Sequence, residues 1–233
     1  MPVSKPHYDF KKSSNIKKNR KYNKNFKAPS TESSSDSESD KGKNKDKHEH
    51  IDDKVTCEGN HIYFQTGVSD KTVATLIKII NQKNNEFKKL LENKMIESAV
   101  PKNLWLHITS YGGDLFACFR AIDAIVNSFI PIYTVVDGYA ASAGTLMSVV
   151  GKKRYMTNSG YMLIHQLSAG ACGNFWQIKD EYGNLEMHME DIYNIYVKHS
   201  KLSKEELKSL LSHDIWFKID KCIEYGLVDE VYV

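Results

Sequence analysis

The sequence predicts an α/β domain built from repeated strand–helix units, preceded by a charged tail. From residue 55 onward, short runs rich in β-branched and aromatic residues alternate with segments whose apolar residues recur every three or four positions. Glycine, proline and asparagine separate these segments, as turns require. Strands that alternate with helices favour a sheet covered by helices. We therefore divide the chain into a tail, residues 1–54, and a folded domain, residues 55–233.

The first half of the domain contains three predicted strands. Residues 61–65 are β-rich and end at a glycine turn, after which Ser69 or Asp70 can cap a helix with apolar residues at helical spacing. A second helical piece is expected within residues 81–103, closed by Pro101. The elements that follow are a strand at 104–108, a helix at about 115–129, a strand at 132–136 and an apolar helix that ends at residue 150.

The second half of the domain is dominated by a long amphipathic helix. After two short strands near residues 155 and 161–164, residues 174–199 place apolar side chains at three-and-four spacing: Ile178, Tyr182, Leu185, Met189, Ile192 and Tyr196. Ser203 and Glu206 form a capping box for the next helix. A short extended piece at 216–217, a helix that stops at Gly226 and a strand at 227–233 complete the domain.

Residues 1–54 have a composition typical of disorder. Two lysine-rich runs flank an acidic, serine-rich block at residues 30–40, and apolar side chains are few, so burial would not offset the entropy of ordering. A basic arm with interleaved aromatic residues could stack on nucleic-acid bases. A solvated tail explains the same composition, and we favour it over a nucleic-acid partner.

Several protein classes are disfavoured by composition. The net charge is only +3, and no stretch approaches the roughly 20 apolar residues of a membrane span. The N-terminus lacks the apolar core of a secretory signal. The four cysteines, Cys57, Cys118, Cys172 and Cys222, match neither zinc nor disulfide-framework spacing, so we expect no metal and no cofactor. We expect a soluble, cytoplasmic protein, with an organellar or viral-host setting left open.

The segment around Ser142 is the most informative for chemistry. A predicted strand runs into small residues, GYAASAG at 138–144, and then directly into an apolar helix. A serine at such a helix start has an exposed hydroxyl beside free backbone N–H groups. The N–H of Ala143 is a candidate oxyanion donor, favoured by the helix dipole. These residues alone leave open that Ser142 is simply a helix cap.

Two further segments point to the same chemistry. A Gly112–Gly113 turn follows the strand at 104–108 and could supply a second oxyanion donor. His165 follows a short apolar run, YMLI, where site residues often lie at a strand end. A single histidine is more often structural than catalytic, so neither feature is decisive by itself.

Taken together, the segments SYGGD, GYAASAGTL, GKKRYMTNSGYMLIHQ and EYGLVDEV occur in an order that resembles the proteolytic subunit of the ATP-dependent Clp protease (ClpP), over roughly residues 61–233. The resemblance implies a ClpP/crotonase-like superhelix of repeated β-β-α units with a protruding handle helix. It implies Ser142 as nucleophile, His165 as base and Asp214 as the residue that orients the imidazole. Gly113 and Ala143 would supply the oxyanion N–H groups.

The resemblance also implies an assembly and partners. The family forms two stacked seven-membered rings that enclose the sites, and an AAA+ Clp unfoldase feeds protein or peptide substrates into the chamber. This sequence departs from the family pattern at Tyr111 and Leu167, where proline is usual. The family's N-terminal docking segment is also unrecognisable ahead of His61, so docking of an unfoldase stays open.

Three alternative functions compete with an active peptidase. A catalytically idle ring component would not require all three triad residues. A crotonase-type acyl-CoA enzyme would leave Ser142, His165 and Asp214 without roles. A signal-peptide-peptidase-like enzyme would need a membrane anchor and a serine–lysine dyad. We therefore expect a Clp-type serine endopeptidase.

Overall fold

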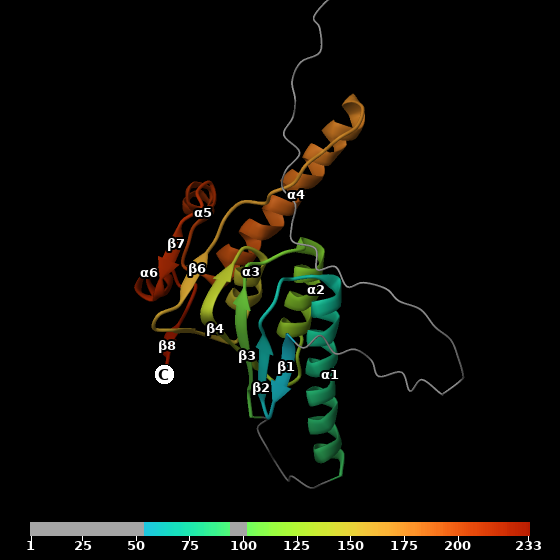
Figure 1. Ribbon diagram of the computed structural model, residues 1–233, viewed down its shortest axis with the longest axis vertical. Helices are drawn as coiled ribbons and strands as arrows, with labels where there is room; N and C mark the ends of the chain where they lie inside the picture. The colour runs from blue at the N-terminus through green and yellow to red at the C-terminus, as the bar shows by residue number, and fades with distance from the viewer. Residues whose placement is uncertain (1–53, 94–101) are drawn as a thin grey trace, which may run out of the picture. The chain divides into compact units, whose positions relative to one another are not determined.

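The structure, a computed structural model, describes residues 54–93 and 102–233, which contain one eight-stranded sheet and six helices (Figure 1). The strands are β1 (Val55–Glu58), β2 (His61–Phe64), β3 (Leu104–Ser110), β4 (Ile132–Ala141), β5 (Lys153–Thr157), β6 (Tyr161–Leu163), β7 (Trp216–Lys218) and β8 (Glu230–Tyr232). The helices are α1 (Asp70–Glu92), α2 (Leu115–Val126), α3 (Ala143–Val149), α4 (Phe175–His199), α5 (Lys204–Leu211) and α6 (Ile219–Glu224). The predicted tail, apart from Lys54, and the predicted helix end at Pro101 lie outside the described residues.

The strand order β1-β2-β3-β4-β5-β8 is mostly parallel, with an antiparallel β1–β2 hairpin at one edge. Parallel neighbours need crossover connections, and the helices supply several of them. This arrangement confirms the predicted α/β class. The long strand β4 serves two partners on one side: its first half pairs with β5 and its last three residues pair with β6.

The change of partner along β4 occurs at a glycine. The register between β3 and β4 shifts between Ile108 and Ser110, and Gly138 has φ +82°, in the left-handed region where glycine is favoured. The Thr109 hydroxyl donates to the Asp137 carbonyl at 2.6 Å and fixes this irregularity. The end of β4 is thereby directed toward β6, and both strands end near the candidate site.

The core lies between the sheet and helices α1, α2 and α3. Val73, Leu76 and Ile80 of α1 are buried, as their spacing predicts, and Ser69 caps that helix through a reciprocal bond with Thr72. Buried apolar residues of β2, β3 and α2 also contribute to this core: Ile62, Phe64, Leu104, Leu106, Ile108, Cys118, Ile122 and Ile125.

One helix differs from the sequence prediction. The expected second helical piece after residue 81 is the continuation of α1, which runs unbroken to Glu92 because no glycine or proline interrupts it. Helix α4 matches the long amphipathic helix expected at 174–199, and its apolar face is buried at the C-terminal end, at Ile192 and Tyr196. Toward the other end α4 extends beyond the sheet (Figure 1), and Tyr182 is 62% exposed.

Candidate active site

Ser142 occupies a strained turn between β4 and α3. Its φ of 54° and ψ of −128° make it the one non-glycine residue with positive φ in the described part of the chain. Such conformations cost roughly 1–3 kcal/mol and are retained where the surrounding structure enforces them. Ser142 is the N-cap of α3, but its side chain makes no capping hydrogen bond. The hydroxyl is therefore left for another role, which disfavours the interpretation that Ser142 is only a cap.

Backbone and side-chain bonds on both sides hold the turn. The Ser142 N–H donates to the Leu163 carbonyl at 2.9 Å, which extends the β4–β6 pairing by one bond. The Ser142 carbonyl accepts from the Thr145 N–H at 2.9 Å and from the Thr145 hydroxyl at 2.6 Å. The Thr145 hydroxyl also lies 2.6 Å from the Tyr196 hydroxyl, and burial raises the pKa of Tyr196 well above its usual range. Helix α4 therefore supports the Ser142 turn through the hydroxyl of Tyr196, which stays protonated.

The first glycine of the Gly112–Gly113 turn permits close approach to Ser142. A Cβ added to Gly112 would lie 2.7 Å from the Ser142 Cβ and 2.9 Å from the Ala143 nitrogen, and Gly112 has φ +91°. No side chain fits there without displacing the serine turn. The sequence indicates Gly113 as an oxyanion donor but gives no sign of this packing role of Gly112, which only the fold reveals.

Two backbone N–H groups are available beside Ser142. Ala143 opens α3, and the first N–H groups of a helix have no intrahelical acceptor. At Gly113, the two flanking bonds, Val68 N–H to Gly112 oxygen and Asp114 N–H to Val68 oxygen, form a parallel bridge. In such a bridge the central residue directs its own N–H away from the partner strand. Gly113 therefore presents its N–H to the opposite side of the turn.

His165 and Asp214 meet because β6 and β7 are antiparallel. Leu163 pairs with Trp216, so continuing the same register past the strand ends places His165 opposite Asp214. The His165 Nδ1 lies 3.3 Å from an Asp214 carboxylate oxygen. The Gln166 N–H donates to the Leu211 carbonyl at 2.8 Å, which ties this segment to the end of α5. The aspartate side chain is 78% exposed, so solvent screens its charge.

One cavity of about 230 Å³ brings the predicted site residues together. Ser142, Ala143, Gly113 and His165 all line it, and Asp214 stands behind the imidazole. No hydrogen bond joins the Ser142 hydroxyl to His165 in the described structure, and contacts of this kind commonly tighten only around substrate. The apolar side chains that complete the wall were not singled out from the sequence as site residues: Leu115, Leu146, Leu167, Ile192 and Tyr196.

The buried thiol nearest the turn is not suited to nucleophilic chemistry. Cys118 donates to the Ala143 carbonyl at 3.2 Å, and burial raises its pKa to about 12. A thiol that stays protonated is a poor nucleophile. Cys118 therefore packs behind the serine turn, and Ser142 remains the nucleophile candidate in this cavity.

An α/β fold that brings a serine turn, free backbone N–H groups and a histidine–carboxylate pair to one cavity has the arrangement of a hydrolase that works by acyl transfer. Comparison with known families agrees with that class. The family model described as Clp protease matches residues 65–233, most of the chain, so the protein belongs to the Clp protease family. The ClpP-type fold and the family resemblance predicted from the sequence are thereby confirmed.

Curated relatives are proteolytic subunits from bacteria. The chain is 27% identical over 190 residues to "ATP-dependent Clp protease proteolytic subunit 1" of Chlamydia muridarum, covering 78% of this chain and 90% of the relative. It is 32% identical over 128 residues to "ATP-dependent Clp protease proteolytic subunit 3" of Streptomyces coelicolor, covering 54% and 59% respectively. Among the described residues, no helix has the length and apolar character needed to cross a membrane.

Proposed function

We propose that this chain is a serine endopeptidase that hydrolyses peptide bonds, with Ser142 as nucleophile. The observation that supports the proposal most directly is that the strained Ser142 turn and His165 line one cavity, with Asp214 3.3 Å behind the imidazole. A serine whose hydroxyl neither caps its helix nor is buried by packing is available for attack. Membership of the Clp protease family supports the same reaction class.

In the proposed mechanism, His165 takes the proton from the Ser142 hydroxyl as its oxygen attacks the peptide carbonyl. Asp214 holds the imidazole in the tautomer that accepts this proton at Nε2. The N–H groups of Gly113 and Ala143 donate to the oxyanion of the tetrahedral intermediate. His165 then returns the proton to the leaving amine, which gives an acyl-enzyme. Water attacks this ester in a second cycle, and the acid product and free Ser142 are released.

We further propose that the chain works as a ring-forming subunit, with stacked heptameric rings as the expected assembly. Exposed aromatic and aliphatic side chains on the free part of α4 support assembly, because a contiguous apolar surface of this kind is usually covered: Phe175, Trp176, Ile178 and Tyr182. The relatives carry the words "ATP-dependent" in their names, so an AAA+ Clp unfoldase is the proposed partner and unfolded proteins are the proposed substrates. Cytoplasmic localisation stays a prediction from the sequence.

Labelling with a fluorophosphonate probe tests the proposal, because the probe phosphonylates an activated serine. We expect the full-length protein to be labelled, and Ser142→Ala to lose the label while keeping the same particle size by light scattering. The matched control is Ser148→Ala, a buried serine on the same helix that does not line the cavity. Absence of labelling on an intact ring would instead favour a catalytically idle ring component.

A further inference from the structure

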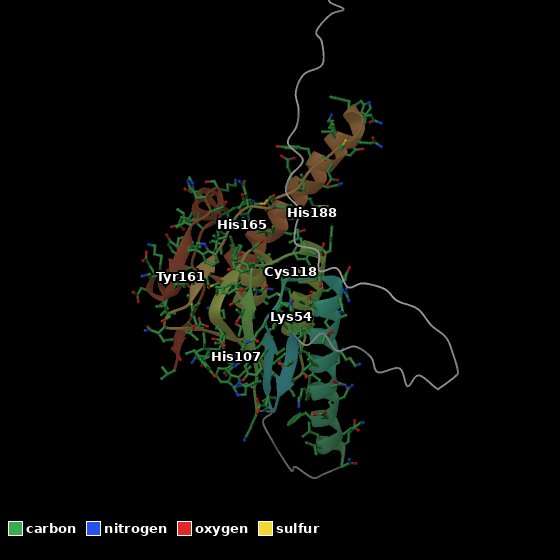
Figure 2. All side chains as sticks on the ribbon, in the orientation of Figure 1. Lys54, His107, Cys118, Tyr161, His165 and His188 are labelled. Atoms are coloured by element: carbon green, nitrogen blue, oxygen red, sulfur yellow. The ribbon has the colours of Figure 1, made fainter. Side chains whose placement is uncertain are left out.

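A second cavity, of about 430 Å³, adjoins the catalytic one. The two cavities share four lining residues, Gly113, Leu115, Leu167 and Ser168, so they form one continuous depression. Figure 2 labels a histidine from each part, His165 in the catalytic cavity and His188 on α4 in the second. A bound peptide that reaches Ser142 can therefore extend into the second cavity.

One face of α4 forms the floor of this second cavity. Glu181, Asn184, Leu185 and His188 follow one another at the three-and-four spacing that places side chains on one helix face. Phe116 closes one side, with its ring edge-on to His188 at 5.2 Å between centroids. The walls are thus formed by α2, by α4 and by the segment at residues 167–169.

The charge in this cavity is negative. Asp114 and Glu181 line it, and no lysine or arginine does so among the described residues; His188 is the one titratable group there that could carry a positive charge. Asp114 caps the N-terminus of α2, because one of its carboxylate oxygens accepts a hydrogen bond from the Ala117 N–H at 2.7 Å. Glu181 accepts only a long bond from Asn184, at 3.4 Å, and is half-buried. Its carboxylate can therefore pair with a cation on a ligand.

The lining of the second cavity indicates which half of a bound peptide would enter it. His165 must protonate the leaving amine, so the leaving half of the peptide lies next to His165. The second cavity is lined by neither Ser142 nor His165; it shares with the catalytic cavity Gly113 and Leu115, beside the oxyanion donor, and also Leu167 and Ser168. Substrate residues that precede the cleaved bond would lie on the Gly113 side and are the ones assigned to it.

We propose that this cavity is a subsite for a lysine or arginine side chain of the substrate, at one of the two positions preceding the residue whose carbonyl is attacked, and that Glu181 selects it. This proposal rests on the proposed peptidase function and adds a substrate class to it. The cleaved residue itself is apolar, since aliphatic and aromatic side chains line the catalytic cavity. An extended peptide advances about 3.3 Å per residue, so neighbouring substrate residues can occupy two cavities that share a wall.

The test uses fluorescent peptides with leucine at the cleaved position and lysine, glutamine or glutamate at each of the two preceding positions. In the intact oligomer we expect lysine to be preferred over glutamate at one of them by about three- to tenfold in kcat/KM, as a half-buried ion pair would give. Glu181→Gln should bring the ratio close to one, and Glu181→Lys should reverse it. Glu186→Lys, on α4 but outside the cavity, is the matched control and should keep the wild-type preference.

Binding to the Ser142→Ala variant, measured by fluorescence anisotropy with the same peptides, separates this proposal from the peptidase proposal. Lysine-selective binding that depends on Glu181 supports the subsite even if wild-type protein cleaves nothing. The subsite proposal is overturned if the lysine-to-glutamate ratio is the same in wild type and in Glu181→Lys, for both cleavage and binding. That result would not affect fluorophosphonate labelling, which tests the peptidase proposal. A preference confined to the leaving side of the bond overturns it as well.

Discussion

The imidazole Nδ1 of His165 lies 3.3 Å from the carboxylate of Asp214, although 49 positions of sequence numbering separate the two residues. The antiparallel register of β6 and β7 brings them opposite each other, and the parallel pairing of β4 and β6 brings Ser142 to the same end of the sheet. Three strand ends therefore hold the proposed triad. A site built on strand ends of one sheet is fixed by backbone hydrogen bonds, so its geometry does not depend on a single loop.

Replacing Asp214 by asparagine should keep the fold and remove the group that orients His165. We expect kcat for a peptide substrate to fall about 10³- to 10⁴-fold, because the amide favours the wrong imidazole tautomer. Thermal stability should change little, since the aspartate side chain is largely exposed. Asp180→Asn, an exposed position on α4, is the control for peptide hydrolysis. Unchanged kcat in Asp214→Asn would remove Asp214 from the proposed triad.

Much of the fold and site could be predicted from the sequence because the informative signals are local. Each of three such signals is contained within a few consecutive residues: the helical spacing around Val73 and Leu76, the small-residue turn at Ser142 and the capping box at Ser203. Ala143 is predicted as an oxyanion donor from the same local motif, and Gly113 from the family resemblance. Their catalytic roles remain proposals that the labelling and mutant experiments address.

Several contacts between distant segments could not be predicted. Nothing in the sequence near Gly112 shows that its missing side chain makes room for Ser142, and nothing near Tyr196 shows that its hydroxyl meets Thr145. The helical spacing of α4 shows one apolar face, and the part of the helix that extends beyond the sheet leaves Tyr182 on that face exposed. Periodicity gives a face of the helix, whereas burial depends on what lies opposite that face.

Gly112→Ala should disrupt the proposed site directly. The new Cβ would lie 2.7 Å from the Ser142 Cβ and 2.8 Å from the Ala141 carbonyl oxygen, at a φ of +91°. Relief requires the serine turn to move, so we expect fluorophosphonate labelling to be lost and stability to fall by about 2–4 kcal/mol. Urea denaturation and labelling are measured together.

The matched control for this substitution is Gly138→Ala. Gly138 has a similar φ of +82°, but no atom lies within 4 Å of an added Cβ. Only backbone strain remains, so a loss of about 1–2 kcal/mol with labelling retained is expected. If Gly112→Ala folds and is labelled like wild type, Gly112 does not control access to Ser142.

The Thr145–Tyr196 pair should show a non-additive response. Thr145→Val removes the bond to the Ser142 carbonyl and leaves the fully buried Tyr196 hydroxyl unpaired, which should destabilise the protein by about 1–3 kcal/mol. Tyr196→Phe leaves Thr145 bonded to Ser142 and should cost about 1 kcal/mol. The double variant should lose less than the sum of the two, because no buried hydroxyl is stranded.

Chemical denaturation of the four proteins in this cycle measures the coupling, and peptide hydrolysis reports its effect on the serine turn. Thr145→Ser, which keeps the hydroxyl, should retain most of the wild-type rate, whereas Thr145→Val should lower kcat more than it raises KM. Additive losses of stability would mean that the two hydroxyl groups do not act as a pair.

The pH dependence of stability should come partly from His107 on β3, which Figure 2 labels. Its side chain is buried against aromatic side chains of the neighbouring strands. Burial, together with His61 at 3.0 Å, lowers the pKa of His107, and Asp137 opposes this only weakly from 3.8 Å. A lowered pKa means that the unfolded chain binds the proton more readily. The stabilising contribution is therefore present above the unfolded histidine pKa of about 6.5 and is lost as the pH falls below it.

Urea denaturation between pH 7.5 and pH 5 should accordingly show decreasing stability, with His107 contributing a slope of at most about 1.4 kcal/mol per pH unit. His107→Phe keeps an aromatic ring of similar size and cannot be protonated, so it should reduce this slope. Some slope should remain, because burial also lowers the pKa of His199. The control is the exposed His213, replaced by glutamine. A slope in His107→Phe equal to that of wild type would show that the buried histidine does not titrate on unfolding in this range.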